Sequence, residues 1–326
     1  MRRQGLLLPM ILLLLLAGCA RDTHRTRLVT PNVDTQPAGI NWCGTLELPG
    51  RWQDDTPTGG LSDLAWDADE QLLYLISDRG WLHRTRPVFE GNELAGLEPL
   101  KTYVLRDAEG HALGEKAADA EALIVQRGNN GVRGDSALLI GFERDHRLQR
   151  FYPNGTPAGQ PLYFRGLRGA EDNRGAEALG RHPVHGVIVG LESPPSGMPE
   201  KTTRLFAMDT GQEWTYPLAE ASGSALTALE THGDGLLALE RAFAPPSPLV
   251  ISLREVQLND DGTASAHTLV RLSTGEGWRL DNFEGLTRLG DNRYLMVSDD
   301  NFSLIQETLL SCFELPPFLE NKNNPH

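Results

Sequence analysis

The sequence lacks the short motifs of several common enzyme classes. It contains no phosphate-binding Walker loop, no HExxH zinc motif, no CxxC pair and no GxSxG nucleophile elbow. These absences remove support for NTP-driven chemistry, for a standard zinc protease and for an α/β-hydrolase triad. The nine histidines are scattered without the spacing of metal ligands.

Positive charge and cysteine are also scarce. The chain has 30 Lys and Arg against 44 Asp and Glu, which gives a net charge of −14. Loss of Arg2 and Arg3 with an N-terminal signal would change this to −16. Such an acidic chain is not a non-specific nucleic-acid binder. The three cysteines, Cys19, Cys43 and Cys312, are few enough to be assigned one by one.

The apolar run near the N-terminus, Leu6 to Leu16, is too short to span a bilayer. It follows two arginines and ends in Leu16-Ala17-Gly18-Cys19, which resembles a bacterial lipobox. We therefore predict a signal peptide over 1–18, a lipidated Cys19 with a flexible tether over 19–38, a folded domain over 39–318 and a disordered tail over 319–326. Ala20 after the cysteine indicates outer-membrane sorting, facing the periplasm. An ordinary cleaved signal or an uncleaved anchor is the alternative.

A repeated hairpin pattern runs through the rest of the chain. Near the end, Glu284 opens an apolar run, a Gly-Asp-Asn turn follows, and a second apolar run closes on Asp299. Fifteen residues separate these two carboxylates, and the same spacing joins Asp63 to Asp78 and Glu177 to Glu192. Further copies run from Glu121 to Glu143 and from Thr227 to Glu240.

The spacing of these hairpins predicts the fold. Their first strands recur at positions 63, 121, 177, 227 and 284, so each interval has 50 to 58 residues. An interval of this size holds about four short strands, and radial repetition of four-stranded sheets is a β-propeller. We predict a single all-β domain of five or six blades, closed by N- and C-terminal strands.

The two remaining cysteines lie in similar contexts at opposite ends of the domain. Cys43 begins Cys-Gly-Thr-Leu-Glu-Leu-Pro and Cys312 begins Cys-Phe-Glu-Leu-Pro. In the last blade, residues 43–48 could supply the missing outermost strand. We predict that a disulfide between Cys43 and Cys312 locks that closure; two buried free thiols are the alternative.

The acids at the hairpin ends should meet at one mouth of the ring. The first strands would bring Asp63, Glu121, Glu177 and Glu284 together, with Asp78, Glu143, Glu192, Glu240 and Asp299 one strand further out. Like charges this close raise one another's pKa values or bind a cation. Arg79, Arg144 and Arg241 follow second-strand acids and could instead pair with them, which would make the ring purely structural.

At these residues the chain also resembles a known family. The segments that carry the likeness are Gly175 to Leu179, Asp281 to Leu286, and Ser298 to Phe302 with Gln306-Glu307-Thr308. They resemble the phytase-like domain family, described as having esterase-like activity of phytase, and the likeness runs from about Leu61 to Leu315. The resemblance implies a secreted or periplasmic propeller that hydrolyses a phosphoester or a related ester.

Two function hypotheses follow. In the first, Glu121, Glu177 and Glu284 hold a divalent cation; their hard oxygen ligands favour Ca²⁺ or Mg²⁺ over zinc, and we expect Ca²⁺ rather than Mg²⁺. Asp63 or Asp299 would take a proton from water, and Arg144 or Arg241 would hold a small anionic ester or phosphoester; a lactone is another candidate substrate. In the second, a monomeric lipoprotein, membrane-bound through its lipid, binds a ligand or partner without catalysis.

Overall fold

The computed structural model describes residues 24–26, 40–52, 54–163, 175–192, 197–290 and 292–316. Its regular structure in these ranges is almost entirely β-strand, with one short 3₁₀ helix at Thr274–Glu276. None of the helices in the described ranges is long and apolar enough to span a bilayer. The all-β prediction is confirmed.

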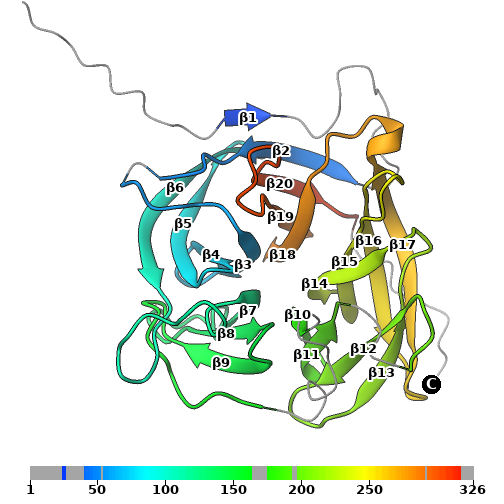
Figure 1. Cartoon of the computed structure of the whole chain (residues 1–326), viewed down its shortest axis with the longest axis horizontal. Helices are drawn as coiled ribbons and strands as arrows, with labels where there is room; N and C mark the ends of the chain where they lie inside the picture. Colours follow the sequence, from blue (N-terminus) through cyan, green and yellow to red (C-terminus); the bar gives the residue numbers. More distant parts are fainter. Residues whose placement is uncertain are drawn as a thin grey trace, which may run out of the picture.

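Five antiparallel sheets stand around a central axis as the blades of a propeller (Figure 1). The first blade contains β3 (Leu61–Asp67), β4 (Leu72–Ser77), β5 (Trp81–Glu90) and β6 (Glu93–Val104). The third contains β10 (Ala176–His182), β11 (Gly186–Leu191), β12 (Thr202–Ala207) and β13 (Glu213–Pro217). The fourth contains β14 (Ser224–His232), β15 (Gly235–Ala242), β16 (Val250–Leu258) and β17 (Ala264–Ser273).

The second blade is shorter than the others. It contains β7 (Ala120–Gln126), β8 (Ala137–Phe142) and β9 (Arg147–Phe151). The fourth position is taken by residues 157–162, which run beside β9 through the isolated bridges Phe151↔Pro157 and Leu148↔Leu162. Five blades are therefore present, which decides between the predicted five and six.

The last blade closes the ring by combining both ends of the chain (Figure 1). Its strands, in order from the axis, are β18 (Asn282–Gly290), β19 (Arg293–Asp299), β20 (Leu309–Glu314), β2 (Asn41–Glu47) and β1 (His24–Thr26). The predicted closing strand is thus β2. Strand β1 lies inside the segment expected to be a flexible tether, so three residues of that segment form an additional edge strand.

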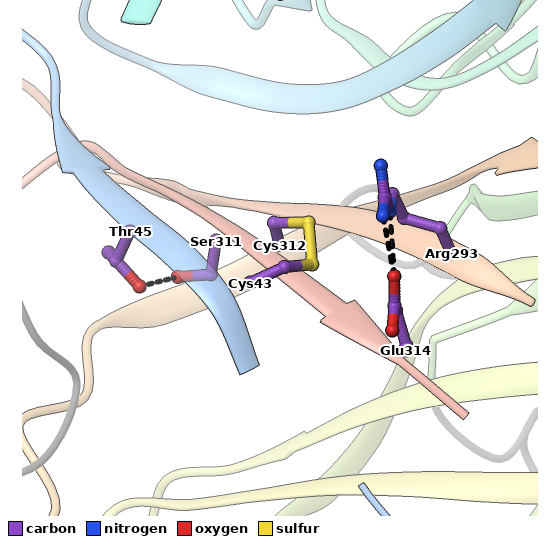
Figure 2. The surroundings of a disulfide bond; sticks show 6 residues. All are labelled: Cys43, Thr45, Arg293, Ser311, Cys312 and Glu314. Atoms are coloured by element: carbon purple, nitrogen blue, oxygen red, sulfur yellow. Dashed lines mark hydrogen bonds and ion pairs between the residues drawn. A yellow bond between two sulfur atoms is a disulfide. The ribbon is translucent and has the colours of Figure 1, made fainter. Parts of the chain in front are cut away.

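The predicted disulfide joins the two strands of this closure. Cys43 of β2 and Cys312 of β20 are bonded, with their Cα atoms 4.9 Å apart (Figure 2). Beside it, the hydroxyl groups of Thr45 and Ser311 lie 3.0 Å apart in a buried hydrogen bond. Covalent and polar contacts therefore hold together strands from opposite ends of the sequence.

The hydrophobic core is divided among the gaps between neighbouring blades. Each of five clusters of buried side chains draws its members from two adjacent sheets. Between the first and second blades, for example, Tyr74 of β4 packs in one cluster with Phe142 of β8. Successive side chains of a strand point to opposite faces, and each face meets a different neighbour, so β4 and β8 are buried at every position. This packing orients the inner strands β3, β7, β10, β14 and β18 around the axis.

Candidate functional site at the propeller mouth

Every inner strand carries a bulge at the same place. The pairing with the second strand skips one residue between Leu61 and Asp63, and it does so at the equivalent point of the other four blades. The residues at the bulges are Ser62, Glu121, Glu177, Thr227 and Glu284. A bulge bends the strand and redirects a side chain. These five residues lie at the end of the axis where the inner strands begin, which we call the mouth.

Asp63 is not the first-blade counterpart of Glu121, as the spacing had suggested. That counterpart is Ser62, and Asp63 lies one residue further along, where the other blades have Ala122, Ala178, Ala228 and Gly285. Its buried carboxylate accepts backbone N–H bonds from Leu64 (2.8 Å), Leu123 (2.7 Å) and Leu286 (3.2 Å). Asp63 therefore ties together the inner strands of three blades, and this placement supports a structural role.

A second set of polar residues surrounds the mouth one strand further out. In each blade, the last pair before the bulge joins the inner strand to the second strand, and the polar residue follows the second-strand member of that pair. The pairs are Leu61↔Ser77, Ala120↔Phe142, Ala176↔Leu191, Leu226↔Glu240 and Phe283↔Ser298. The polar residues are Asp78, Glu143, Glu192, Arg241 and Asp299. Four of the five predicted second-strand acids thus occupy equivalent positions, and an arginine takes the fifth.

Glu240, the fifth predicted acid, lies away from the mouth. It is 1% exposed and its carboxylate accepts hydrogen bonds from Tyr216 Oη (2.5 Å), Ser224 Oγ (2.7 Å) and the backbone N–H of Ala219 (2.7 Å). Arg254 Nη1 completes the site at 2.6 Å. Because its oxygens already have partners, Glu240 joins the third and fourth blades and is not available for a ligand.

The carboxylates of Asp119, Glu121 and Glu143 form the tightest acidic group in the described ranges. One carboxylate oxygen from each lies within 4.8 Å of the other two, a separation that could hold a metal ion. The metal set predicted from the sequence, Glu121, Glu177 and Glu284, shares only Glu121 with this group. Asp119 was missed because it precedes its strand and has no counterpart in the fifteen-residue spacing, although its position two residues before Glu121 was visible.

The electrostatics of the mouth favour neutral carboxyl groups. Burial, followed by the charges of Glu177 and Glu284, raises the pKa of Glu121 well above its usual value. Burial likewise raises the pKa of Glu177, and the next contributions come from Glu192 and Glu143. Burial raises the pKa of Glu143 to about 7, although a hydrogen bond with the Glu177 side chain opposes that shift. The three inner glutamates therefore lie close enough to affect one another.

Acids of the closing blade and the first blade are shifted in the same direction. Burial raises the pKa of Glu284 to about 7 despite the opposing effect of Arg241. It raises the pKa of Asp299 to about 8, to which the charge of Glu284 contributes, and that of Asp78 to about 6. Several carboxyl groups at the mouth can thus exchange protons near neutral pH.

Two of the predicted arginines contact acids of the mouth. Arg241 Nη2 lies 3.3 Å from Glu192 Oε1 and 3.6 Å from Glu284 Oε1. Arg144 Nε lies 3.0 Å from Asp119 Oδ2, and its side chain is 49% exposed. Arg241 is therefore held between two blades, whereas Arg144 lies at the rim, where a ligand can reach it.

The segment between β19 and β20 covers one side of the mouth. Asp300 Oδ1 accepts the N–H groups of Gly60 and Phe302, both at 2.9 Å. The Phe302 ring lies so close to Gly60 that a Cβ there would approach it to 2.3 Å, and Gly60 also has a positive φ of 66°. The Arg79 guanidinium stacks on the same ring, 3.4 Å from its centroid. Arg79 thus helps to hold the segment between β19 and β20 at the mouth.

Comparison with known proteins finds one family whose sequence model matches most of the chain. Residues 56–302 match the family described as "Phytase-like: Esterase-like activity of phytase". Among solved structures, a protein of unknown function from Dyadobacter fermentans is similar at 11% identity and a TM-score of 0.43, covering 86% of this chain and 100% of that one. The Neurospora crassa Pan2 WD40 domain is similar at 10% identity and a TM-score of 0.38, covering 87% and 98%.

No curated protein matches the chain. The family match spans most of the sequence and includes all five bulge positions and both rings of the mouth. The segments of the family resemblance, around Glu177, Glu284 and Asp299, are the ones that build this mouth. The chain therefore belongs to the phytase-like family, described by its esterase-like activity of phytase.

Proposed function

We propose that the chain is an ester hydrolase whose active site is the acidic mouth and whose cofactor is a divalent cation. The observation that carries this proposal is the convergence of Asp119, Glu121 and Glu143, with carboxylate oxygens within 4.8 Å of one another. Membership of a family described by esterase-like activity supports the hydrolytic part. The preferred substrate is a phosphoester or a related ester.

The three carboxylates are suited to a hard cation. Oxygen is the ligand that Ca²⁺ and Mg²⁺ prefer, and Ca²⁺ is favoured because it tolerates irregular sets of carboxylates. Burial and neighbouring charges make ionised Glu121 costly, and a cation would offset that cost. When bound, such a cation polarises the ester oxygen and lowers the pKa of a bound water.

The remaining residues supply proton transfer and anion binding. Glu284, with a pKa raised to about 7, is partly ionised at neutral pH and can accept a proton from the attacking water. Asp299, with a pKa raised to about 8, stays largely protonated and can donate to the leaving group. Arg144 at the rim can hold an anionic group of the substrate. We therefore propose a role in proton transfer for Glu284, which the sequence analysis predicted as a metal ligand.

Hydrolysis of aryl substrates tests this proposal. We expect 4-nitrophenyl phosphate or 4-nitrophenyl acetate to be cleaved in the presence of Ca²⁺, and EDTA to remove that activity. Glu121→Gln should lower the rate at least a hundredfold, whereas Glu98→Gln, an exposed acid on the outer strand β6, should not change it. Hydrolysis of a lactone should be measured together with these two aryl substrates. Cleavage that resists EDTA and survives Glu121→Gln would contradict the proposal.

A binding propeller without catalysis is the second candidate. It is favoured by the arginine contacts, since Arg241 lies against Glu192 and Glu284 and Arg144 lies against Asp119. In that case Ca²⁺ would still raise the melting temperature, but neither the aryl substrates nor the lactone would be cleaved. Thermal scans and rate measurements on the same samples separate the two candidates.

We also propose that the protein is anchored to the bacterial envelope through lipid on Cys19, which lies outside the described residues. Support comes from the lipobox and from β1, which begins only five residues later at His24. Five extended residues span about 17 Å at most, so the edge of the closing blade would lie near the membrane. Cys19→Ser should release the protein from membranes at high salt; a variant that still sediments with them would contradict the anchor.

A further inference from the structure

At the opposite end of the propeller axis, two inner strands carry arginines. Four residues past the bulge, the inner strands carry Trp66, Val125, Arg181, Thr231 and Arg288 at equivalent positions. Four further residues of extended strand span about 13 Å, so these residues lie toward the end of the axis remote from the mouth. Arg181 and Arg288 thus take two of these five positions, on the strands that carry Glu177 and Glu284 at the mouth.

A cavity of about 790 Å³ opens on this remote face. Its polar lining consists of Gln126, Arg127, Asn129, Arg150 and Arg181, and aromatic rings of Trp66 and Tyr152 complete it with small residues. None of the described residues that line it is an aspartate or glutamate. Three guanidinium groups without a carboxylate in the wall are unusual in a chain with a net charge of −14.

The arginines of this cavity have donors to offer. Arg150 uses its Nε to donate to Gln126 Oε1 at 2.9 Å, and its two Nη groups have no partner among the described residues. The Arg181 side chain is exposed and makes no ion pair with a described residue. Arg127 Nε lies 3.8 Å from Asp135 Oδ2, a long contact for a side chain that is 59% exposed. A guanidinium presents its N–H groups in a planar fork that matches phosphate and carboxylate.

One wall of the cavity is held rigidly. The turn between β7 and β8 is fixed to the first blade by Asp69, which accepts the N–H groups of Asn130 (2.7 Å) and Gly131 (3.0 Å). The N–H of Asp69 in turn donates to Gly128 O at 2.9 Å. The backbone on either side of Gly128, which carries Arg127 and Asn129, is therefore fixed before any ligand arrives, and this lowers the entropy cost of binding.

We propose that this cavity is a second binding site, for a small anion that carries a phosphate or carboxylate group attached to a flat ring. The anionic group would lie among Arg127, Arg150 and Arg181, and the ring would contact Trp66 and Tyr152. The site is independent of the proposed hydrolase activity, because it shares no residue with the mouth and lies at the other ends of the inner strands.

Calorimetric titration in EDTA with phenyl phosphate, benzoate and inorganic phosphate tests the site, because EDTA removes the cation on which the proposed hydrolysis depends. We expect phenyl phosphate or benzoate to bind in the micromolar to low millimolar range, at least fivefold more tightly than inorganic phosphate. The preferred probe of the first two identifies the anionic group. Arg181→Ala should weaken binding at least tenfold without changing the melting temperature, because the interactions of Arg181 with other described residues are made by its backbone. Tyr152→Ala should remove the preference for the ring.

Two outcomes would overturn the proposal. One is the absence of measurable binding of all three anions up to 10 mM, a concentration set by the roughly millimolar lower limit of useful affinity. The other is binding that survives Arg181→Ala combined with Arg150→Ala but disappears in Glu121→Gln, which would place the anion at the mouth. Loss of hydrolysis with intact anion binding would overturn only the proposed function.

Discussion

The two ends of the propeller axis are built by the same five strands and differ in charge. At the mouth, the bulges hold Glu121, Glu177 and Glu284, and burial raises their pKa values. At the remote end, Arg181 lies near the axis and Arg127 and Arg150 line the adjoining cavity. The net charge of −14 for the whole chain does not reveal that acids gather at one end and arginines at the other. Local chemistry in a propeller is therefore set by the position of a residue along its strand, and the overall composition says little about it.

Between the two ends, the wall of the axis is structural. Asp63 has the burial of an active-site acid but accepts three backbone N–H groups from three blades. Glu230 of the fourth blade likewise binds backbone, because its carboxylate accepts the N–H of Arg288 in the closing blade at 2.9 Å. An acid with its oxygens bonded to backbone stabilises the ring, whereas an acid facing other acids favours a cation. Substitutions at the two kinds of residue should therefore have different effects on stability and on cation binding.

The largest expected effect comes from opening the ring itself. Replacing both Cys43 and Cys312 by serine removes a cross-link between residues 269 apart in sequence, for which the chain-entropy model gives about 6 kcal/mol as an upper value. We expect a lower unfolding midpoint in denaturant but an unchanged Ca²⁺ response and unchanged anion binding. A variant that loses either ligand would show that the ends depend on the closure.

The next largest effect is expected at Asp63. Asp63→Ala leaves three buried N–H groups without an acceptor, and each such group costs about 1 to 3 kcal/mol. We expect the free energy of unfolding to fall by about 3 kcal/mol or more, measured by urea denaturation. Asp261→Ala, at an exposed turn, should change it by less than about 0.5 kcal/mol. A mild effect at Asp63 with loss of catalysis would instead make it a member of the active site.

A smaller effect should appear as pH dependence in EDTA. Carboxyl groups at the mouth have folded-state pKa values above their ordinary ones, about 7 for Glu143 and Glu284 and about 8 for Asp299. The native state therefore binds more protons than the unfolded state, and stability falls as pH rises. The stability that these bound protons contribute is fully present below about pH 4, where ordinary carboxyl groups are protonated as well. It is lost as the pH rises through 7 to 8.

We expect the melting temperature in EDTA to decrease between pH 5 and pH 8, and Ca²⁺ to reduce that decrease. Glu284→Gln combined with Asp299→Asn should flatten the curve. A melting temperature that rises over this range in the wild type would show that the acids of the mouth are ionised and well paired at neutral pH.

Much of the fold was visible in the sequence because each blade repeats a local signal. Apolar runs separated by Gly- and Asp-rich turns recur at 50 to 58 residues, and the matching contexts of Cys43 and Cys312 indicated the closure. The family resemblance was carried by the same residues. Only the irregular fourth position of the second blade and the added strand β1 were missed, because two bridges and a three-residue strand leave no periodic pattern.

The site was harder to predict because residue spacing does not reveal bulges. Asp63 and Glu240 fit the fifteen-residue pattern of acids, or nearly so, yet each lies one register position from the mouth. A shift of one residue along a strand moves a side chain to the other face of the sheet, and this shift distinguishes the structural acids Asp63 and Glu240 from candidate ligands. Asp119, Arg127 and Arg150 come from turns and an outer strand, so three-dimensional packing alone brings them to their sites.

The central claim is that Asp119, Glu121 and Glu143 hold a divalent cation. A thermal scan of wild type, Glu121→Gln, Glu284→Gln and Glu98→Gln, each in EDTA and in 5 mM Ca²⁺ or Mg²⁺, tests it most directly. A cation bound only by the native state at 100 times its Kd adds about 2.7 kcal/mol to the free energy of unfolding. We expect a rise of several degrees in wild type, Glu284→Gln and Glu98→Gln, and none in Glu121→Gln. A wild type without any metal response, or a response abolished by Glu284→Gln and kept by Glu121→Gln, would contradict the claim.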